Sequence, residues 1–246
     1  MDGVTRLLAP AKLTIALQVT GVRADGYHLI AAEMASLDLF DTIDIDDANE
    51  STLSVDGPYA GGVPEDDSNL VMRALRLAGR TARVHITKNV PNGGGLGGGS
   101  SDAAAVLRWA GFTDLGAASM VGADIPFCMV GGRATVTGIG ENVQPLPFVS
   151  REITLVIPPL HVSTPAVYRK WDDMGAPRSH PVNHLTEAAI AVEPQLAEWR
   201  ERIHGAAGTE PILAGSGATW FLHGHHPGIA PALAGASVIT TNTRPA

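Results

Sequence analysis

Short segments in which hydrophobic and polar residues alternate occur throughout the chain, and this two-residue period is typical of β-strands. In residues 13–20, for example, Ile15, Leu17 and Val19 would share one face of an extended chain. Other apolar segments also favour strands, and they lie at residues 37–45, 51–55, 83–90, 127–130, 134–137, 153–157, 219–222 and 238–241.

Segments with helical signals separate these strands. A cap at Asp67 or Ser68 predicts a helix that ends near residue 77. A proline at position 165, directly after a Ser-Thr cap, predicts a helix that carries Tyr168. Further helices are expected at residues 102–109, 116–121 and, in two pieces around a proline, 183–199. The mixture of strands and helices predicts an α+β or α/β protein.

The composition is that of a globular protein and lacks the features of nucleic-acid or membrane proteins. The chain has 246 residues, of which 45% are hydrophobic, so it can build one large core or two small ones. Its net charge of −8 differs from the basic character of a nucleic-acid-binding surface. Its longest apolar runs are far shorter than a membrane span. We therefore expect neither nucleic acid nor membrane among its partners.

Two further features bear on location and domain organisation. The N-terminal residues lack a signal-peptide pattern, and Cys128 is the only cysteine, so no intrachain disulfide can form. Both features favour a reducing, cytoplasmic location. Pro145 and Pro147 mark a break in the pattern of elements. This break predicts one domain over residues 1–148 and a second over residues 149–246.

The most distinctive stretch is the glycine loop at residues 91–102, in which six of the seven positions 93–99 are glycine. A strand-like segment precedes it and an alanine-rich, helix-like segment follows. Glycines let backbone N–H groups approach a ligand closely, and a helix N-terminus adds unpaired N–H donors and a positive dipole. Together with the hydroxyls of Ser100 and Ser101, these groups predict a polyphosphate-binding site.

The glycine run matches a linker, a Walker loop or a dinucleotide fingerprint less well. A flexible linker would be polar on both sides, whereas both flanks here are apolar. A Walker loop ends in Gly-Lys-Ser/Thr, and no lysine follows these glycines. Gly93, Gly95 and Gly98 satisfy the dinucleotide pattern G-x-G-x-x-G, which leaves an oxidoreductase as an alternative. That pattern also needs an acid at a strand end, and Asp124 has loop-like neighbours.

Several stretches, in family order across most of the chain, resemble the GHMP kinases, which include galactokinase, homoserine kinase and mevalonate kinase. The glycine loop resembles their second motif, and the Ala-Gly-Ser-Gly-Ala stretch at 214–218 resembles their third. Other stretches are similar to one family within this group, the 4-diphosphocytidyl-2-C-methyl-D-erythritol kinases. They are Pro-Ala-Lys-Leu at 10–13, Arg-Ala-Asp-Gly-Tyr-His at 23–28, Gly-Ala-Asp-Ile-Pro-Phe at 122–127 and Gly-Ile-Gly-Glu at 138–141.

The resemblance implies an ATP-dependent kinase that phosphorylates the 2-hydroxyl of 4-diphosphocytidyl-2-C-methyl-D-erythritol in non-mevalonate isoprenoid biosynthesis. The implied fold has two α+β lobes with the active site between them. The first lobe would be ribosomal-S5-like and the second ferredoxin-like. ATP and Mg²⁺ are the implied cofactors, and a cytidine-diphosphate sugar alcohol is the implied small-molecule partner. We expect a monomer or a weak homodimer.

Residue by residue, the resemblance implies that Lys12 and Asp124 form the catalytic pair. A carboxylate within hydrogen-bond reach can take the proton of a sugar hydroxyl. An ammonium beside it keeps the carboxylate ionised and offsets charge that develops on the phosphoryl group. ATP would be held by the glycine loop, through Pro91, Gly93, Gly94, Gly95, Leu96, Gly97, Gly98, Gly99, Ser100 and Ser101.

The resemblance also implies a binding site for the cytidine substrate. Tyr27 and His28 match the positions that recognise the base, and Tyr168 falls where the family has a second aromatic residue. Two rings could hold the pyrimidine between them, and core packing is the alternative role for each tyrosine. Gly215 and Ser216, in the third motif, are implied at the same site.

Two departures from the family pattern leave alternatives open. Thr14 stands where the family usually has asparagine, and a hydroxyl offers fewer hydrogen bonds than an amide. The segment between residues 109 and 122 is short for the family, which would open the adenine side of the site. A GHMP-type kinase for a different small alcohol is therefore one alternative. A nucleotide-binding protein that has lost turnover is another.

Overall fold

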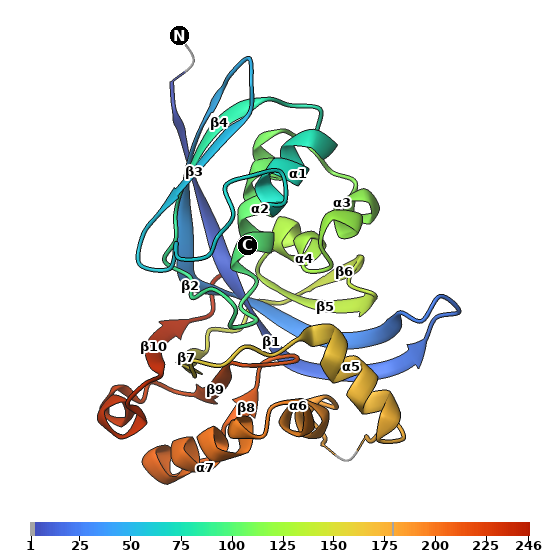
Figure 1. The fold of residues 1–246 in the computed structure, drawn as a ribbon, viewed down its shortest axis with the longest axis vertical. Helices are drawn as coiled ribbons and strands as arrows, with labels where there is room; N and C mark the ends of the chain where they lie inside the picture. The colour runs from blue at the N-terminus through green and yellow to red at the C-terminus, as the bar shows by residue number, and fades with distance from the viewer. Residues whose placement is uncertain (1–2, 179) are drawn as a thin grey trace.

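The computed structural model describes residues 3–178 and 180–246, and its elements form two β-sheets with helices packed against them (Figure 1). We term the first sheet and its helices the first lobe, and the second sheet and its helices the second lobe. The α+β class predicted from the sequence is confirmed. No helix of the described residues combines the length and hydropathy required to cross a membrane.

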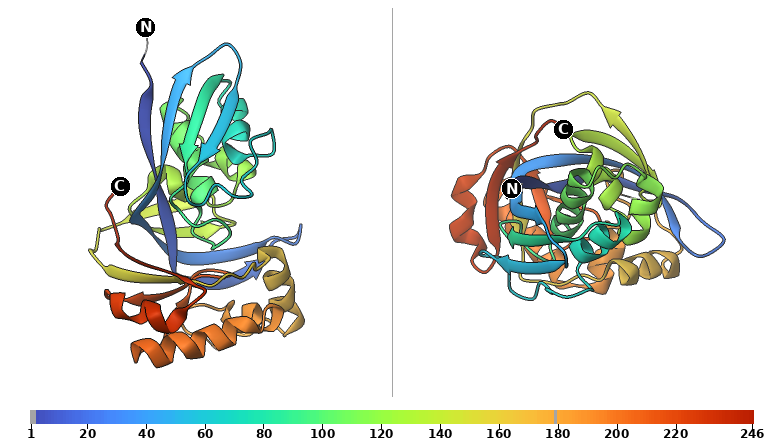
Figure 2. Two further views of the ribbon diagram at one scale, coloured as in Figure 1. Left: turned by 60° about the vertical axis from the view of Figure 1, so that its left-hand side comes forward. Right: turned by 90° about the horizontal axis from the view of Figure 1, so that it is seen from above.

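The first lobe is built on a six-stranded sheet. Its strands are β1 (Thr5–Val22), β2 (His28–Asp47), β3 (Thr52–Asp56), β4 (Ala82–Thr87), β5 (Arg133–Gly138) and β6 (Asn142–Leu146). They follow the order β3-β4-β2-β5-β6, and β1 pairs with β2. β1 and β2 form a long antiparallel hairpin whose closed end projects to one side of the molecule (Figure 2).

Four helices of the first lobe pack beside this sheet (Figure 1). They are α1 (Leu70–Leu77), α2 (Gly98–Trp109), α3 (Leu115–Val121) and α4 (Ile125–Val130). α2 is buried from Ser101 to Leu107 and contacts α1, α4 and β1. Its run of three alanines lets these neighbours approach closely, and the packing fixes the helix whose N-terminus ends the glycine loop.

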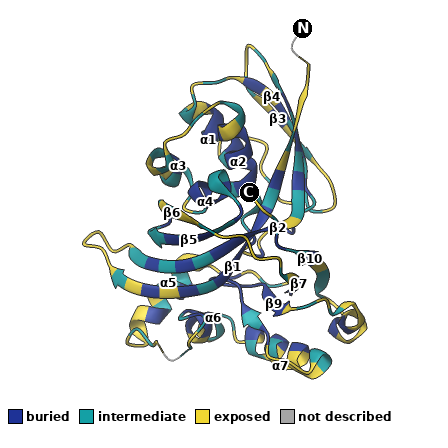
Figure 3. Cartoon of the chain, turned by 180° about the vertical axis from the view of Figure 1, so that it is seen from behind, coloured by how far each residue is buried: buried dark blue, intermediate teal, exposed yellow. Residues whose placement is uncertain are grey.

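The second lobe has a four-stranded antiparallel sheet. Its strands are β7 (Glu152–Ile157), β8 (Ile212–Leu213), β9 (Trp220–His223) and β10 (Ser237–Asn242), in the order β10-β7-β9-β8. Its helices are α5 (Thr164–Asp173), α6 (Thr186–Val192), α7 (Gln195–Ala207) and the 3₁₀ helix η1 (Pro227–Leu233). These helices bury one side and expose the other (Figure 3). The proposed boundary at 148/149 falls between β6 and β7, and it stays a prediction.

A shared core joins the two lobes and fixes the space between them. Leu13 of the first sheet packs with Leu155 and Phe221 of the second sheet in one buried cluster. The backbone N–H of Leu17 donates to the carbonyl of Val182 at 2.9 Å. Since β1 takes part in both contacts, it carries residues of the first lobe directly to the wall of the second.

The structure corrects one predicted strand. Residues 127–130 belong to helix α4. A short apolar run has no period that distinguishes a buried strand from a buried helix, so its tertiary contacts decide. Pro126 lies in the first turn of α4, where its fixed φ suits a helix, and Ile125 and Phe127 are buried in the core of the first lobe.

The structure also moves one predicted helix cap. α1 is capped by Asn69, whose side chain accepts a hydrogen bond from the N–H of Val71 at 2.9 Å. Neither Asp67 nor Ser68 fills that position. The backbone N–H of Ser68 instead donates to the Asp66 carboxylate at 2.9 Å, which makes a turn ahead of the helix.

Candidate active site

A cleft of about 610 Å³ opens between the two lobes. The glycine loop, the β1–β2 hairpin and α5 all contribute to its walls. The structure brings many of the predicted site residues to this one cleft, namely Lys12, Thr14, Tyr27, His28, Gly95, Ser100, Asp124, Tyr168, Gly215 and Ser216.

Lys12 and Asp124 form an ion pair in the wall of the cleft. Lys12 Nζ lies 3.3 Å from Asp124 Oδ2, and the two side chains are 8% and 33% exposed. Lys12 Nζ also donates to the Thr14 hydroxyl at 3.2 Å. A nearly buried ammonium therefore supports a carboxylate that is open to the cleft. This arrangement presents a proton acceptor to the cleft and places a cation beside it.

The glycine loop holds Lys12 in place. The backbone N–H of Lys12 donates to the carbonyl of Leu96 at 2.9 Å. Gly97 has φ +69°, and a Cβ at this position would lie 2.7 Å from Cγ of Lys12. The stem of Lys12 thus passes directly against the loop at a residue that must be glycine. The same loop can contact phosphates and set the position of the ammonium.

Given the catalytic role that the resemblance implies for Lys12, we expect Gly97→Ala to lower kcat/KM by about 10²-fold, because a displacement of such a group by about 1 Å can have that effect. The added methyl would push against the stem of Lys12. Gly62→Ala is the matched control, since Gly62 also has positive φ (+77°) but has open space around it. Steady-state kinetics of both variants checks this. Equal activity of the two variants would show that backbone strain, and not the position of Lys12, sets any loss.

The glycine loop also packs closely against the second lobe. The Thr219 hydroxyl donates to the carbonyl of Gly94 at 2.6 Å. A Cβ on Gly95 would lie 2.7 Å from the carbonyl oxygen of Gly217. Some of the glycines are therefore required by contact between the lobes, in addition to any contact with a ligand.

Some residues of the glycine loop are buried, whereas others are exposed or half-buried. The exposed residues are Gly93, Gly95 and Gly99, and the half-buried residues are Gly97, Gly98 and Ser100. Pro91, Gly94 and Leu96 are buried, and so is Ser101, whose hydroxyl donates to the carbonyl of Pro10 at 2.6 Å. The buried residues shape the loop, while the others lie at or near the surface of the chain.

The N-terminus of α2 follows directly on the glycine loop. Gly97 is its N-cap, in a left-handed conformation, and within the described chain no side chain caps this end of the helix. The first N–H groups of a helix have no intrahelical partner, and the helix dipole is positive there. A helix N-terminus of this kind can supply donors to a polyphosphate, and that role stays a prediction here.

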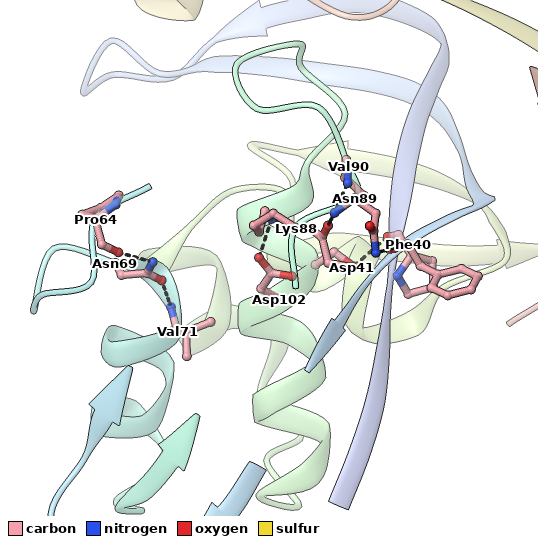
Figure 4. Close-up of polar contacts among 11 residues, drawn as sticks. Phe40, Asp41, Pro64, Asn69, Val71, Lys88, Asn89, Val90 and Asp102 are labelled. Atoms are coloured by element: carbon pink, nitrogen blue, oxygen red, sulfur yellow. Dashed lines mark hydrogen bonds and ion pairs between the residues drawn. The ribbon is translucent and has the colours of Figure 1, made fainter. Parts of the chain in front are cut away.

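A buried charge cluster lies under the loop, and the sequence reasoning did not identify it (Figure 4). Lys88 Nζ donates to Asp102 Oδ2 at 2.7 Å and also to Asp41 Oδ2. The other oxygen of Asp41 accepts from the backbone N–H groups of Asn89, at 2.6 Å, and Val90, at 2.8 Å. The cluster therefore ties the start of the loop, its helix and β2 together. Asp41 shares the buried face of β2 with Ile43 and Ile45, and this acid on an apolar face was the available signal.

In this cluster, burial and neighbouring charges have opposite effects on the pKa values of Lys88 and Asp102. Burial acts to lower the pKa of Lys88, but Asp102 and Asp41 outweigh it and raise that pKa. Burial raises the pKa of the Asp102 carboxyl, although the Lys88 ammonium opposes this effect. Asp102 Oδ1 is buried and has no hydrogen-bond partner among the described residues. One ammonium thus serves two carboxylates in a region without access to water.

Aromatic side chains line the part of the cleft near the β1–β2 hairpin. Tyr27, in the turn of the hairpin, is 59% exposed. The rings of His28 and Tyr168 lie 4.7 Å apart, centroid to centroid. Burial raises the pKa of the Tyr168 hydroxyl, and this side chain packs against the cores of both lobes. Tyr168 therefore has the predicted alternative role, in core packing, while one part of it still faces the cleft.

The third motif is held by a residue that the sequence reasoning missed. Asn183 is buried, and its amide donates to the carbonyls of Leu213, at 2.9 Å, and Gly215, at 2.7 Å. The Ser216 hydroxyl lies 2.7 Å from the Thr164 hydroxyl, so a hydrogen bond ties the motif to the start of α5. A lone asparagine in a loop gives no sequence signal for this role.

The amino-acid sequence is similar to one protein family and to individual enzymes of known name. The family described as "GHMP kinases N terminal domain" matches residues 69–132. The 4-diphosphocytidyl-2-C-methyl-D-erythritol kinase of Ruegeria pomeroyi is 38% identical, over 87% of this chain and 86% of that protein. The enzyme of the same name from Paracoccus denitrificans is also 38% identical, over 88% of this chain and 85% of that protein.

The chain is also similar to solved structures. A crystal structure of 4-(cytidine 5'-diphospho)-2C-methyl-D-erythritol kinase is 30% identical and has a TM-score of 0.79, covering 97% of this chain and 99% of the other. The mevalonate kinase of Methanococcus jannaschii is 11% identical, with a TM-score of 0.61 over 99% of each chain. The second likeness is one of fold alone.

Proposed function

Since the chain belongs to the 4-diphosphocytidyl-2-C-methyl-D-erythritol kinase family of the GHMP kinases, we propose that it transfers the γ-phosphoryl group of ATP to the 2-hydroxyl of that cytidine-diphosphate sugar alcohol. This is a step of non-mevalonate isoprenoid biosynthesis. The ion pair of Lys12 and Asp124 at the cleft is the observation that carries the proposal. The proposal takes Asp124 as the base, Lys12 as its supporting cation and the adjacent glycine loop as the phosphate-binding element.

The residues of the pair have distinct roles in the proposed reaction. Asp124 accepts the proton of the 2-hydroxyl as its oxygen forms a bond to the γ-phosphorus, and the bond to the β,γ-bridging oxygen breaks to release ADP. The Lys12 ammonium, whose Nζ lies 3.3 Å from Asp124 Oδ2, offsets negative charge on the phosphoryl group. Phosphoryl transfer needs mainly alignment and charge stabilisation, and the backbone of Lys12 is fixed by its bond to the glycine loop.

The triphosphate is proposed to lie against the glycine loop. Exposed and half-buried positions 93, 95 and 97–100 would present backbone N–H groups and the Ser100 hydroxyl. Pro91, Gly94, Leu96 and Ser101 would act by holding the loop in shape. This division is supported by the open N-terminus of α2.

The residues of the cleft fit a Mg²⁺ ion that arrives with the nucleotide. The described residues contain no group of three His, Cys, Asp or Glu side chains that could hold a metal ion. Mg²⁺ in kinases is commonly held by one or two protein groups together with phosphates. The Ser100 hydroxyl belongs to a cleft-lining residue and would supply one such group. When bound, the ion would offset the charge of the phosphates.

The base of the substrate is proposed to stack on Tyr27. Tyr27→Ala is expected to raise KM for the alcohol by about 5- to 150-fold, because stacking on an aromatic ring contributes roughly 1–3 kcal/mol per base. Tyr27→Phe, which retains the ring, is the matched control. Steady-state kinetics checks this prediction. An unchanged KM in the alanine variant would place the base elsewhere.

An activity assay tests the proposed function. ADP release would be measured by a coupled assay with 4-diphosphocytidyl-2-C-methyl-D-erythritol and a panel of other small alcohols, because Thr14 replaces the usual asparagine of the family. The proposal predicts turnover with the cytidine substrate in preference to the others. Turnover with another alcohol alone would favour a GHMP-type kinase of different specificity. ATP binding without turnover on any alcohol would indicate a nucleotide-binding protein.

Location, assembly and domain division are each proposed from one feature of the chain. A cytoplasmic location is supported by the single cysteine, Cys128, which is buried and free. A monomer, or a weak homodimer, is proposed because a single chain supplies both the Lys12–Asp124 pair and the glycine loop of the proposed site. Lobes over residues 1–148 and 149–246 are supported by the separate sheets that β6 ends and β7 begins.

A further inference from the structure

We propose that Asp172 determines base specificity by positioning His28, so that the ring presents a hydrogen-bond acceptor to the amino group of cytosine. This inference rests on the proposed function, because it takes the base of the substrate to lie at the aromatic part of the cleft. Asp172 itself belongs to α5 and is a positioning residue. Nothing in the sequence pattern pointed to it.

The His28 side chain is held on several sides. Its Nε2 lies 2.9 Å and 3.1 Å from the two carboxylate oxygens of Asp172. One face of the ring lies against Tyr168, with centroids 4.7 Å apart and planes inclined by 31°. Trp171 packs edge-on at 5.9 Å, and its own Nε1 donates to the carbonyl of Pro177 at 2.9 Å. The side chain of His28 is 10% exposed, so its orientation is fixed before any ligand binds.

The carboxylate fixes which ring nitrogen carries the hydrogen. An ionised carboxylate only accepts hydrogen bonds, so Nε2 of His28 must be the donor in this pair. In a neutral imidazole, Nδ1 is then an acceptor. Among the described residues, Asp172 is the only side chain or carbonyl that is hydrogen-bonded to the His28 ring. Nδ1 therefore remains available to a ligand.

The walls of the cleft indicate where a base would lie. The cleft is lined by the phosphate-binding loop and also by Tyr27, His28 and Tyr168, which are the ring-bearing residues of its wall. The ring of Tyr27 is unusually exposed for an aromatic side chain. A flat base is the part of a nucleotide-linked alcohol that such rings bind best.

An acceptor at Nδ1 would distinguish cytosine from uracil. Cytosine carries an amino group at C4, which donates a hydrogen bond, whereas uracil carries a carbonyl there, which only accepts. An acceptor that faces another acceptor leaves both groups unpaired, and sites built for a hydrogen bond reject a ligand that lacks it. Asp172 would therefore favour the cytidine substrate through His28, without touching the base.

The test compares kcat/KM for 4-diphosphocytidyl-2-C-methyl-D-erythritol with that for its uridine analogue. The wild-type enzyme is expected to prefer the cytidine substrate by about 100-fold or more. Asp172→Asn is expected to lower this preference by about tenfold or more, because an amide can also donate to Nε2 and so place the hydrogen on Nδ1. Asp173→Asn, the adjacent exposed acid on the same helix, is the matched control and should keep the wild-type ratio.

A second measurement does not depend on any variant. Nitrogen-15 NMR of the histidine side chains of the wild-type protein should show His28 with hydrogen on Nε2 and a bare Nδ1. A wild-type substrate preference in Asp172→Asn, or hydrogen on Nδ1 in the free enzyme, would overturn the inference and leave the proposed function intact. Absence of turnover with the cytidine substrate in the wild-type enzyme would instead overturn both.

Discussion

Replacing Asp124 with asparagine is expected to lower kcat by about 10²- to 10⁴-fold, the usual contribution of a positioned general base. The amide keeps the size of the side chain and can still accept a hydrogen bond, but it cannot take the proton of the 2-hydroxyl. ATP affinity should change little, because the phosphates lie against the glycine loop in this account. Single-turnover kinetics and calorimetric titration with ATP measure the two effects separately.

Asp173→Asn is a suitable control for this experiment too, since Asp173 is exposed at the end of α5. It should leave kcat within about twofold of the wild-type value, as is usual for an exposed residue outside the site. Near-normal turnover in Asp124→Asn would remove Asp124 from the mechanism as the base. A loss of ATP affinity that matches the loss of kcat would indicate that Asp124 acts mainly in nucleotide binding.

The second large effect is expected at the buried cluster. Lys88→Met should lower the free energy of unfolding by about 3–5 kcal/mol, because it leaves buried carboxylates without their cation. Lys88, Asp41 and Asp102 are all almost fully buried. Since the cluster also ties down the start of the glycine loop, KM for ATP should rise. Urea denaturation followed by circular dichroism measures the stability.

Two further variants make this prediction specific. Arg76→Met breaks the exposed ion pair with Asp67 and should cost about 1 kcal/mol or less, since exposed pairs contribute little. Adding Asp102→Asn to Lys88→Met should restore part of the lost stability, because it removes one of the two unpaired charges. Stability of Lys88→Met within about 1 kcal/mol of the wild type would contradict the account of the cluster.

Much of the fold could be predicted because the local sequence pattern favoured the same strands and helices that packing selects in the folded chain. The alternation in residues 13–20 became part of β1, and the segment marked by Pro165 became α5, although its N-cap Ser163 makes no side-chain cap hydrogen bond. The error at residues 127–130 arose because this short apolar run has no period, and packing against α2 selects a helix. Strand β6 (Asn142–Leu146) was missed, since it is short and largely exposed.

In the candidate site, residues that lie in family motifs could be predicted from the sequence, whereas the residues that support them could not. Motif resemblance singled out Lys12 and Asp124, and the structure places them 3.3 Å apart, although their catalytic roles stay predictions. Lys88 and Asn183 escaped the sequence reasoning because their importance lies in tertiary hydrogen bonds. Nothing near either residue in the sequence shows which distant groups it will meet. Supporting residues of a site are in general visible only once the fold is known.

A crystal structure with a non-hydrolysable ATP analogue and 4-diphosphocytidyl-2-C-methyl-D-erythritol tests the central claim most directly. The account predicts the 2-hydroxyl oxygen at hydrogen-bond distance, about 2.6–3.2 Å, from the Asp124 carboxylate. The γ-phosphate should lie beside Lys12, with the phosphates against the glycine loop. A 2-hydroxyl turned away from Asp124, or a nucleotide bound outside that loop, would contradict it.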